Sequence, residues 1–180
     1  TRSNIVGIVV SDEPPTWNRM SAAFAQGLKS VNPNAKLLYS VIGKDAYADA
    51  AGGKRNTEDQ IAVGADVVFG QGDGASFGML QACSIKKARD GGKVWFIDVI
   101  GDKRSIDRAD VLLSSILFDF SVVYDEIILS IMDGTFGKQH WVSMKNGGIQ
   151  MLTPNKAVSK NIRAEIEAAQ KQILSGKIDV

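Results

Sequence analysis

The sequence predicts an α/β fold with a parallel sheet flanked by helices on both faces. Short apolar runs rich in β-branched residues recur along the chain, as at residues 5–10 and 67–69. Segments with apolar residues at helical intervals separate these runs, and the alternation continues from residue 5 to residue 131. Nearly continuous apolar strands are typical of parallel sheets buried on both faces. Alternation of strand and helix further predicts right-handed crossovers with helices on each face.

The first crossover helix follows a predicted strand at residues 5–10. Its apolar residues recur at helical intervals until Asn32-Pro33-Asn34 ends the helix. These apolar residues are Trp17, Met20, Phe24, Leu28 and Val31. We then predict a strand over residues 36–42, a Gly- and Ala-rich loop over 43–53, and a helix over 54–63 that Gly64 ends.

Residues 67–98 are predicted to form one βαβ unit, which is central to the fold. A strand leads into the glycine-rich turn 70–74, a helix follows, and a strand over 94–99 contains Asp98. The helix carries Phe77, Leu80, Cys83 and Ala88 before Asp90-Gly91-Gly92 ends it. In open parallel sheets the ligand crevice lies beyond the carboxyl ends of the strands. The glycines and Asp98 fall at such ends, so we predict a ligand site there.

The rest of the chain is predicted to contain a fifth strand, two helices and a hairpin. Residues 111–117 form the strand, and an amphipathic helix over 120–131 follows it. Residues 141–145 and 149–152 flank the turn signal Asn146-Gly147-Gly148, which predicts two short strands. A closing helix carries an apolar stripe that we assign to the core, and Gly176 ends it. The stripe consists of Val158, Ile162, Ile166, Ala169 and Ile173.

Composition limits the function classes. The chain has 180 residues, 44% hydrophobic and 23% charged, which suits one well-packed domain. Its formal net charge is +1 and its basic residues are dispersed, so we expect neither nucleic acid nor a membrane surface as a partner. No apolar run approaches the roughly 20 residues of a spanning helix.

The residues needed for familiar catalytic and metal sites are scarce. Cys83 is the only cysteine and His140 the only histidine, so neither a disulfide framework nor a zinc site is expected. We expect Cys83 to be buried and inert. No G-x-S-x-G motif occurs, and we predict no catalytic residues and no cofactor. A magnesium site built from aspartates is an alternative, although helix capping explains them at least as well. These aspartates are Asp66, Asp73, Asp98 and Asp102.

A second alternative is an NAD(P)- or flavin-binding enzyme domain. Residues 70–75 fit G-x-G-x-x-A, and Asp98 lies about 20 residues on, where a ribose-binding acid is expected. Asp73, however, places a negative charge inside the turn that would hold the pyrophosphate. The unit is also the third βαβ step of the chain. The turn suits an uncharged sugar or base equally well.

Several stretches match one family in order and spacing over nearly all of the chain. In the first half they are Pro15 with Met20, Phe24 and Gly27, then Asn32-Pro33, Tyr47-Ala48-Asp49 and residues 64–69. In the second half they are Phe96-Ile97-Asp98, Leu113-Ser114-Ser115, Asn146-Gly147-Gly148-Ile149 and Ser175-Gly176-Lys177-Ile178. The ordered set resembles the basic membrane protein family of solute-binding lipoproteins.

The resemblance implies a fold like one lobe of a type I periplasmic binding protein. The family includes receptors that deliver purine and other nucleosides to ABC-type importers, so it implies a nucleoside-like ligand, transporter membrane subunits as partners and an extracytoplasmic location. On this interpretation residues 1–117 form the ligand-binding lobe. Residues 118–180 pack on that lobe or on a missing first lobe, whose absence would favour a homodimer. A cytoplasmic ligand-sensing regulator with the same fold remains a further alternative.

The resemblance also implies ligand-binding residues. Tyr47 would stack on a nucleobase, Asp98 would accept hydrogen bonds from ribose hydroxyls, and Gly72 would let the ligand meet the backbone. The alternative roles are a half-buried loop tyrosine and a helix-capping carboxylate. We expect Asp98 at the rim of the site, outside the core. Phe118 stands where many members have a lysine, which leaves the ligand open between a nucleoside and another small polar molecule.

Overall fold

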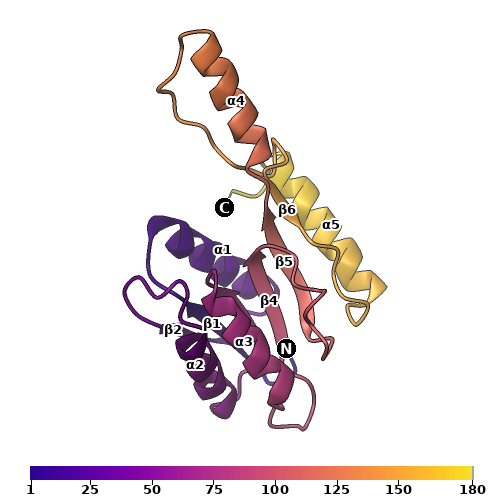
Figure 1. Ribbon diagram of the computed structural model, residues 1–180. Coiled ribbons are helices and arrows are strands. Elements are labelled where there is room, and N and C mark those ends of the chain that lie inside the picture. Colours follow the sequence, from indigo (N-terminus) through magenta and orange to yellow (C-terminus); the bar gives the residue numbers. More distant parts are fainter. Residues whose placement is uncertain (180) are drawn as a thin grey trace. The chain divides into compact units, whose positions relative to one another are not determined.

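The computed structural model describes residues 1–179 (Figure 1). The elements alternate between strand and helix over most of the chain, as predicted. They are β1 (Ile5–Val10), α1 (Pro15–Val31), β2 (Lys36–Val41), α2 (Ala50–Ala62), β3 (Val67–Gln71), α3 (Ala75–Ile85), β4 (Trp95–Ile100), β5 (Leu112–Phe118), α4 (Ser121–Met132), β6 (Ile149–Met151) and α5 (Lys160–Leu174).

The strands form a mostly parallel sheet in the order β2-β1-β3-β4-β5-β6. β1 pairs in parallel with both β2 and β3, and β3 pairs in parallel with β4. The short β6 pairs with β5 in the antiparallel direction. The order places the end of β3 beside the end of β4, with Phe69 opposite Ile97 in the register. The α/β fold class is therefore confirmed.

Helices cover both faces of the sheet. Two successive residues of β3 show this, because one contacts α1 and the next contacts α3. Phe69 stacks on Phe24 of α1, with the ring centroids 4.7 Å apart. The next residue, Gly70, faces the opposite way. A Cβ at Gly70 would lie 2.7 Å from the sulfur of Met79 in α3 and 2.6 Å from the Phe96 ring. α1 and α3 therefore lie on opposite faces.

The helices α2 and α3 pack side by side through glycines (Figure 1). A Cβ at Gly53 would lie 2.4 Å from the carbonyl oxygen of Ala75, and one at Gly78 would lie 1.7 Å from that of Ala50. This contact corrects the expectation of a loop over residues 43–53. α2 begins at Ala50, capped by Asp49, because its glycines allow close packing rather than a flexible loop.

The chain divides into two compact units. The first contains Thr1–Val99 and Lys103–Ser114, and the second contains Ile100–Asp102 and the residues from Ser115 onward. The core of the first unit is built from fully buried side chains of the strands and of α3. They include Ile8, Val9, Val68, Met79 and Phe96.

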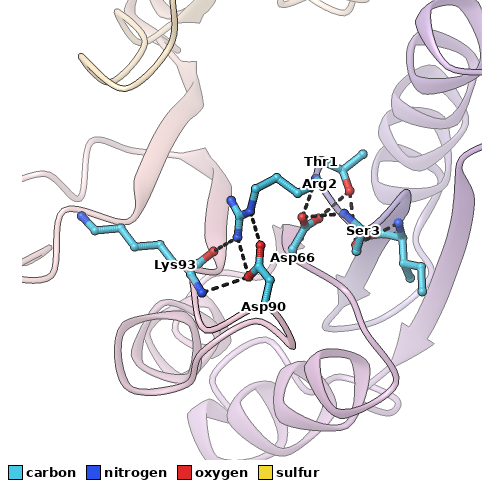
Figure 2. Close-up of polar contacts among 8 residues, drawn as sticks. Thr1, Arg2, Ser3, Asp66, Asp90 and Lys93 are labelled. Carbon is cyan, nitrogen blue, oxygen red and sulfur yellow. Dashed lines mark hydrogen bonds and ion pairs between the residues drawn. The ribbon is translucent and has the colours of Figure 1, made fainter.

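Asp66 fixes the segment that precedes β1 (Figure 2). Its buried carboxylate accepts hydrogen bonds from the N–H groups of Arg2 (2.6 Å) and Ser3 (2.9 Å) and from the Thr1 hydroxyl (2.5 Å). The Arg2 guanidinium in turn pairs with Asp90 at 2.6 Å. Burial raises the pKa of Asp66, but the donors outweigh it and hold this pKa below its usual value.

The helix predicted to reach Ala88 ends earlier. α3 stops at Ile85, and the following Lys86 is extended. Lys87 then forms an antiparallel bridge with Lys93 around a turn in which Gly91 has φ of +79°. Ala88 is buried in this turn, so its apolar side chain gave a false helical signal.

The predicted hairpin at residues 141–152 is also wrong in its first strand. The Asn146 side-chain oxygen accepts from the N–H groups of Ser143 (3.0 Å) and Gly148 (3.1 Å) and closes a turn. Such side-chain bonds compete with a strand ladder. Only β6 remains, and it pairs with β5, where Met151 lies opposite Ile116.

The two helices of the second unit expose much of their apolar surface. No residue of α5 is buried, so the assignment of its stripe to the core is wrong. The described part of this unit has few elements to cover a helix face. In α4 only Val123 and Ser130 are buried. The exposed apolar residues of α4 are Tyr124, Ile128, Leu129, Ile131 and Met132.

Candidate functional site

The candidate site lies at the carboxyl ends of the strands in the first unit. Tyr47 lies in the loop after β2, Gly72 directly follows β3, and Asp98 lies near the end of β4. Ligands of open parallel sheets bind at this edge. The structure therefore places three of the four predicted ligand residues in one unit, on loops or strand ends of the same edge.

Asp98 is fully buried, which corrects the expectation of a rim carboxylate outside the core. β4 continues for two residues beyond Asp98, to Ile100. The Oδ2 atom of Asp98 accepts a hydrogen bond from the Lys103 ammonium. Its Oδ1 atom is also buried and has no donor in hydrogen-bonding geometry within residues 1–179, although the Ser76 hydroxyl and the Val99 N–H lie near the carboxylate and favour its charged form. A buried carboxylate with one free oxygen is costly unless something else satisfies it.

Burial raises the pKa of Asp98 above its usual value, and the nearby Lys103 charge opposes this rise. The ammonium favours the charged carboxylate, while burial disfavours it. The pair thus has no net formal charge when both groups are ionised. Perturbed carboxylates at a sheet edge are candidates for functional groups.

Lys103 and Phe77 join Asp98 at this site, and the sequence interpretation did not single them out. The Lys103 ammonium lies 5.4 Å from the centroid of the Phe77 ring, within the range of a cation–π contact. Phe77, in the first turn of α3, is 51% exposed. The available signal was a lysine five residues after the strand aspartate, in the charged connection that follows.

Tyr47 lies beside Asp12, which follows β1. The Tyr47 hydroxyl is 3.5 Å from Asp12 Oδ2, and the same oxygen accepts from the N–H of Asp45 at 3.0 Å. This N–H and that of Glu13 lower the pKa of Asp12. Burial and the Asp12 charge raise the pKa of Tyr47, so the phenol stays neutral. Tyr47 is half-buried, and its role in stacking remains a prediction.

The glycine-rich turn links the Tyr47 loop to α3. The N–H of Ala75 donates to the Tyr47 carbonyl at 2.7 Å, and a Cβ at Gly74 would lie 3.1 Å from the Ala48 Cα. A Cβ at Gly72 would lie 3.0 Å from the Ala75 Cβ. Packing against α3 and the loop accounts for these glycines without a pyrophosphate.

Phe118 belongs to the second unit and ends β5. It is half-buried and meets Phe120 edge to face, with the centroids 5.9 Å apart. Ser115, in the same unit, is buried and donates to the Gly101 carbonyl at 2.8 Å. The structure thus explains Phe118 as part of a small aromatic cluster, and its role in ligand binding remains a prediction.

The aspartates considered for magnesium do not gather. Asp66 precedes β3 and accepts hydrogen bonds from residues 1–3, whereas Asp73 follows β3 at the opposite end of the strand. No group of three or more His, Cys, Asp or Glu residues suited to a metal ion occurs within residues 1–179. Over the same residues, no helix is both long and apolar enough to cross a membrane. Cys83 is buried, as predicted, and burial raises the pKa of its thiol.

The mostly parallel sheet, its two helical layers and the polar groups at its carboxyl edge are typical of α/β proteins that bind small ligands. The family described as ABC transporter substrate-binding protein PnrA-like (Bmp) has a sequence model that matches residues 1–180. The chain belongs to this family. The resemblance inferred from the ordered motifs is therefore confirmed.

Known relatives agree with this membership. The chain is 25% identical over 191 residues to a "CD4+ T-cell-stimulating antigen" of Listeria innocua, covering all of this chain and 53% of that protein. It is 27% identical over 184 residues to a Haloferax volcanii protein named "Putative ABC transporter glucose-binding protein TsgA13", covering 44% of it. The chain thus spans about half the length of the relatives it matches.

Solved structures support the fold. A solute-binding protein of an ABC transporter system from Aeropyrum pernix K1 aligns with a TM-score of 0.78 and 20% sequence identity. The alignment covers 97% of this chain and 56% of that one. The fold is thus that of solute-binding proteins of this type.

Proposed function

We propose that this chain acts in an extracytoplasmic solute-binding component of an ABC-type importer, without catalysis, and holds a small neutral ligand. The observation that carries the proposal is Asp98, a buried carboxylate with an unbonded oxygen at the ligand-binding edge of a substrate-binding family member. Such an atom needs a hydrogen-bond donor, and a ligand hydroxyl supplies one. The transporter membrane subunits are the proposed macromolecular partners.

A nucleoside is the first candidate ligand. Membership of a family that includes nucleoside receptors supports it, as does the placing of Tyr47 in the loop after β2 and Asp98 near the end of β4, at the same edge. Tyr47 would stack on the base and Asp98 would accept hydrogen bonds from the ribose hydroxyls. Gly72 would let the ligand approach the protein backbone. Phe118, which stands where many family members have a lysine, is a further proposed ligand residue.

A free sugar is the second candidate. The Haloferax volcanii relative is named a putative glucose-binding protein, which favours this class. Both candidates present vicinal hydroxyls to Asp98. They differ in the flat base that only a nucleoside offers to Tyr47.

Titration followed by nuclear magnetic resonance tests the proposal on the 180-residue chain. We expect adenosine or glucose to shift backbone signals of the Tyr47 loop, the 72–74 turn and residues near Asp98. NAD should bind no more tightly than adenosine, because the turn carries Asp73. Affinity should be weak, since relatives of twice the length have further chain to enclose a ligand. Absence of any shift at this edge with all ligands would contradict the proposal.

A further inference from the structure

The ammonium of Lys103 has hydrogen-bonding capacity to spare. A lysine ammonium has three N–H donors. Among the described residues, Asp98 is the hydrogen-bond partner of Lys103, and the centroid of the Phe77 ring lies 5.4 Å from the ammonium. The Lys103 side chain is only 11% exposed. A largely desolvated cation with unused donors is set up to meet an acceptor.

Asp98, behind Lys103, has the complementary need. Its Oδ1 is buried and accepts no hydrogen bond from residues 1–179. One spare acceptor therefore lies next to spare donors. A hydroxyl group can accept through its oxygen and donate through its hydrogen at the same time. An alcohol or vicinal diol matches this pair of groups.

We propose that Lys103 is a ligand-contacting residue that, with Asp98, selects an uncharged hydroxyl-bearing ligand, a free sugar or the ribose of a nucleoside. The inference deepens the proposed function and rests on it. Lys103 donates to a ligand oxygen, and the ligand hydroxyl donates to Asp98. Lys103 is the more exposed of the two, so the ligand meets it first.

Phe77 supplies the apolar part of this subsite. Its ring is half exposed in the first turn of α3 and borders the ammonium. A sugar ring has an apolar face of C–H groups, which an exposed aromatic ring covers. A sugar contact would thus explain why the Phe77 side chain is exposed next to Lys103 and Asp98.

Charge balance decides between neutral and phosphorylated ligands. Asp98 neutralises Lys103, so the pair lacks the net positive charge that holds a phosphate. A phosphate also offers acceptors where Asp98 requires a donor. The unphosphorylated sugar is therefore the preferred form.

The test measures binding of glucose, glucose 6-phosphate, adenosine and AMP to the 180-residue chain by chemical-shift titration. Lys103→Met should weaken glucose and adenosine binding about tenfold or more, because a charged hydrogen bond is lost. Phe77→Ala should weaken both severalfold. Lys86→Met and Ile85→Ala, at the other end of α3, are matched controls and should stay within twofold.

The parent protein gives a second measurement should Lys103→Met not fold. Added sugar should move the carboxyl carbon signal of Asp98 and the side-chain signals of Lys103. Shifts at Tyr47 and Gly72 without these would overturn the inference and leave the proposed function standing. Tenfold tighter binding of glucose 6-phosphate than of glucose, or Lys103→Met within twofold of the parent, would also overturn it. No shifts with any ligand would reject both.

Discussion

The Asp98–Lys103 pair places two ionised groups where the fold would prefer apolar side chains. Asp98 is fully buried and Lys103 nearly so, which makes their desolvation expensive. The pair also leaves Asp98 Oδ1 without a donor in the described residues. Arrangements that weaken a core in this way are typical of functional sites.

The first prediction concerns this pair. Lys103→Met leaves a buried unpaired carboxylate and should lower the free energy of unfolding by about 3–5 kcal/mol. The double variant Asp98→Leu with Lys103→Met should recover most of the loss, since it replaces the pair with apolar packing. Urea denaturation gives both values, with Lys86→Met as the control for loss of an exposed ion pair. Equal stability of the Lys103 and Lys86 variants would refute the prediction.

The second prediction concerns acid stability. Arg2 lowers the pKa of Asp90 to about 2, and the donors of residues 1–3 lower that of Asp66 (Figure 2). A carboxyl group with a lowered folded-state pKa stabilises the fold above its unfolded pKa. This contribution is lost as the pH falls through the folded value. The free energy of unfolding should therefore decrease from about pH 4 toward pH 2.

Urea denaturation at several pH values measures this dependence. Asp66→Asn should flatten the decrease, because the variant has no carboxylate to protonate at this position. Asp59→Asn is the control, since Asp59 lies exposed on α2. An unchanged slope in the Asp66 variant would show that its hydrogen bonds do not carry the effect.

At the scale of elements, the close packing of α2 on α3 positions the site. It brings the Tyr47 loop onto the first turn of α3 through the bond from Ala75 N–H to the Tyr47 carbonyl. Gly78 makes the approach possible, because a Cβ there would lie 1.7 Å from the Ala50 carbonyl oxygen. The small residues of these helices therefore influence the geometry of a site that they do not line.

The third prediction compares two helical glycines. Gly27 in α1 has open space around its Cβ position, so Gly27→Ala should stabilise the protein by roughly 0.5–1 kcal/mol. Gly78→Ala gains the same helix propensity but should lose about 1–3 kcal/mol by forcing α2 away from α3. Thermal or urea denaturation gives the two signs. Stabilisation by Gly78→Ala would contradict the packing that the structure shows.

The order of elements could be predicted because buried strands and amphipathic helices have different periods. Errors arose where one signal has two physical causes. Gly52 and Gly53 suggested a loop, whereas they allow helix packing. Ala88 continued an apolar spacing after the backbone had already left the helix. Residues 141–145 alternate like a strand, but Asn146 closes a turn.

The site, too, could be predicted only where local sequence determines the structure. The position of Asp98 near a strand end was predictable from the apolar run that precedes it. Its burial and its partner Lys103 were not, because the pair depends on how the connection after β4 folds back. Phe77 gave a helical apolar signal that resembles a core residue, although its ring is half exposed.

At the scale of the whole molecule, α4 exposes a run of large apolar side chains. Tyr124, Ile128 and Met132 recur at helical spacing and are each more than half exposed. Contiguous apolar patches of this kind mark interaction surfaces. We expect that the isolated chain associates through α4.

The fourth prediction tests that association. Sedimentation velocity of the 180-residue chain should show dimers or larger species at high concentration. Ile128→Glu should shift the distribution toward monomer, because burial of a charge at the contact is costly. Ile106→Glu, in the first unit, is the control at a similarly exposed isoleucine. A strictly monomeric parent chain at all concentrations would refute this prediction.

The central claim is that the carboxyl edge of the sheet binds a hydroxyl-bearing ligand through Asp98. The most direct measurement is the dissociation constant of the best ligand for the parent and for Asp98→Asn, by titration at pH 7. Asp66→Asn, a buried aspartate at the opposite edge, is the matched control. Loss of a charged hydrogen bond predicts roughly ten- to a hundredfold weaker binding for Asp98→Asn and little change for Asp66→Asn. Binding by a folded Asp98→Asn within twofold of the parent would contradict the claim.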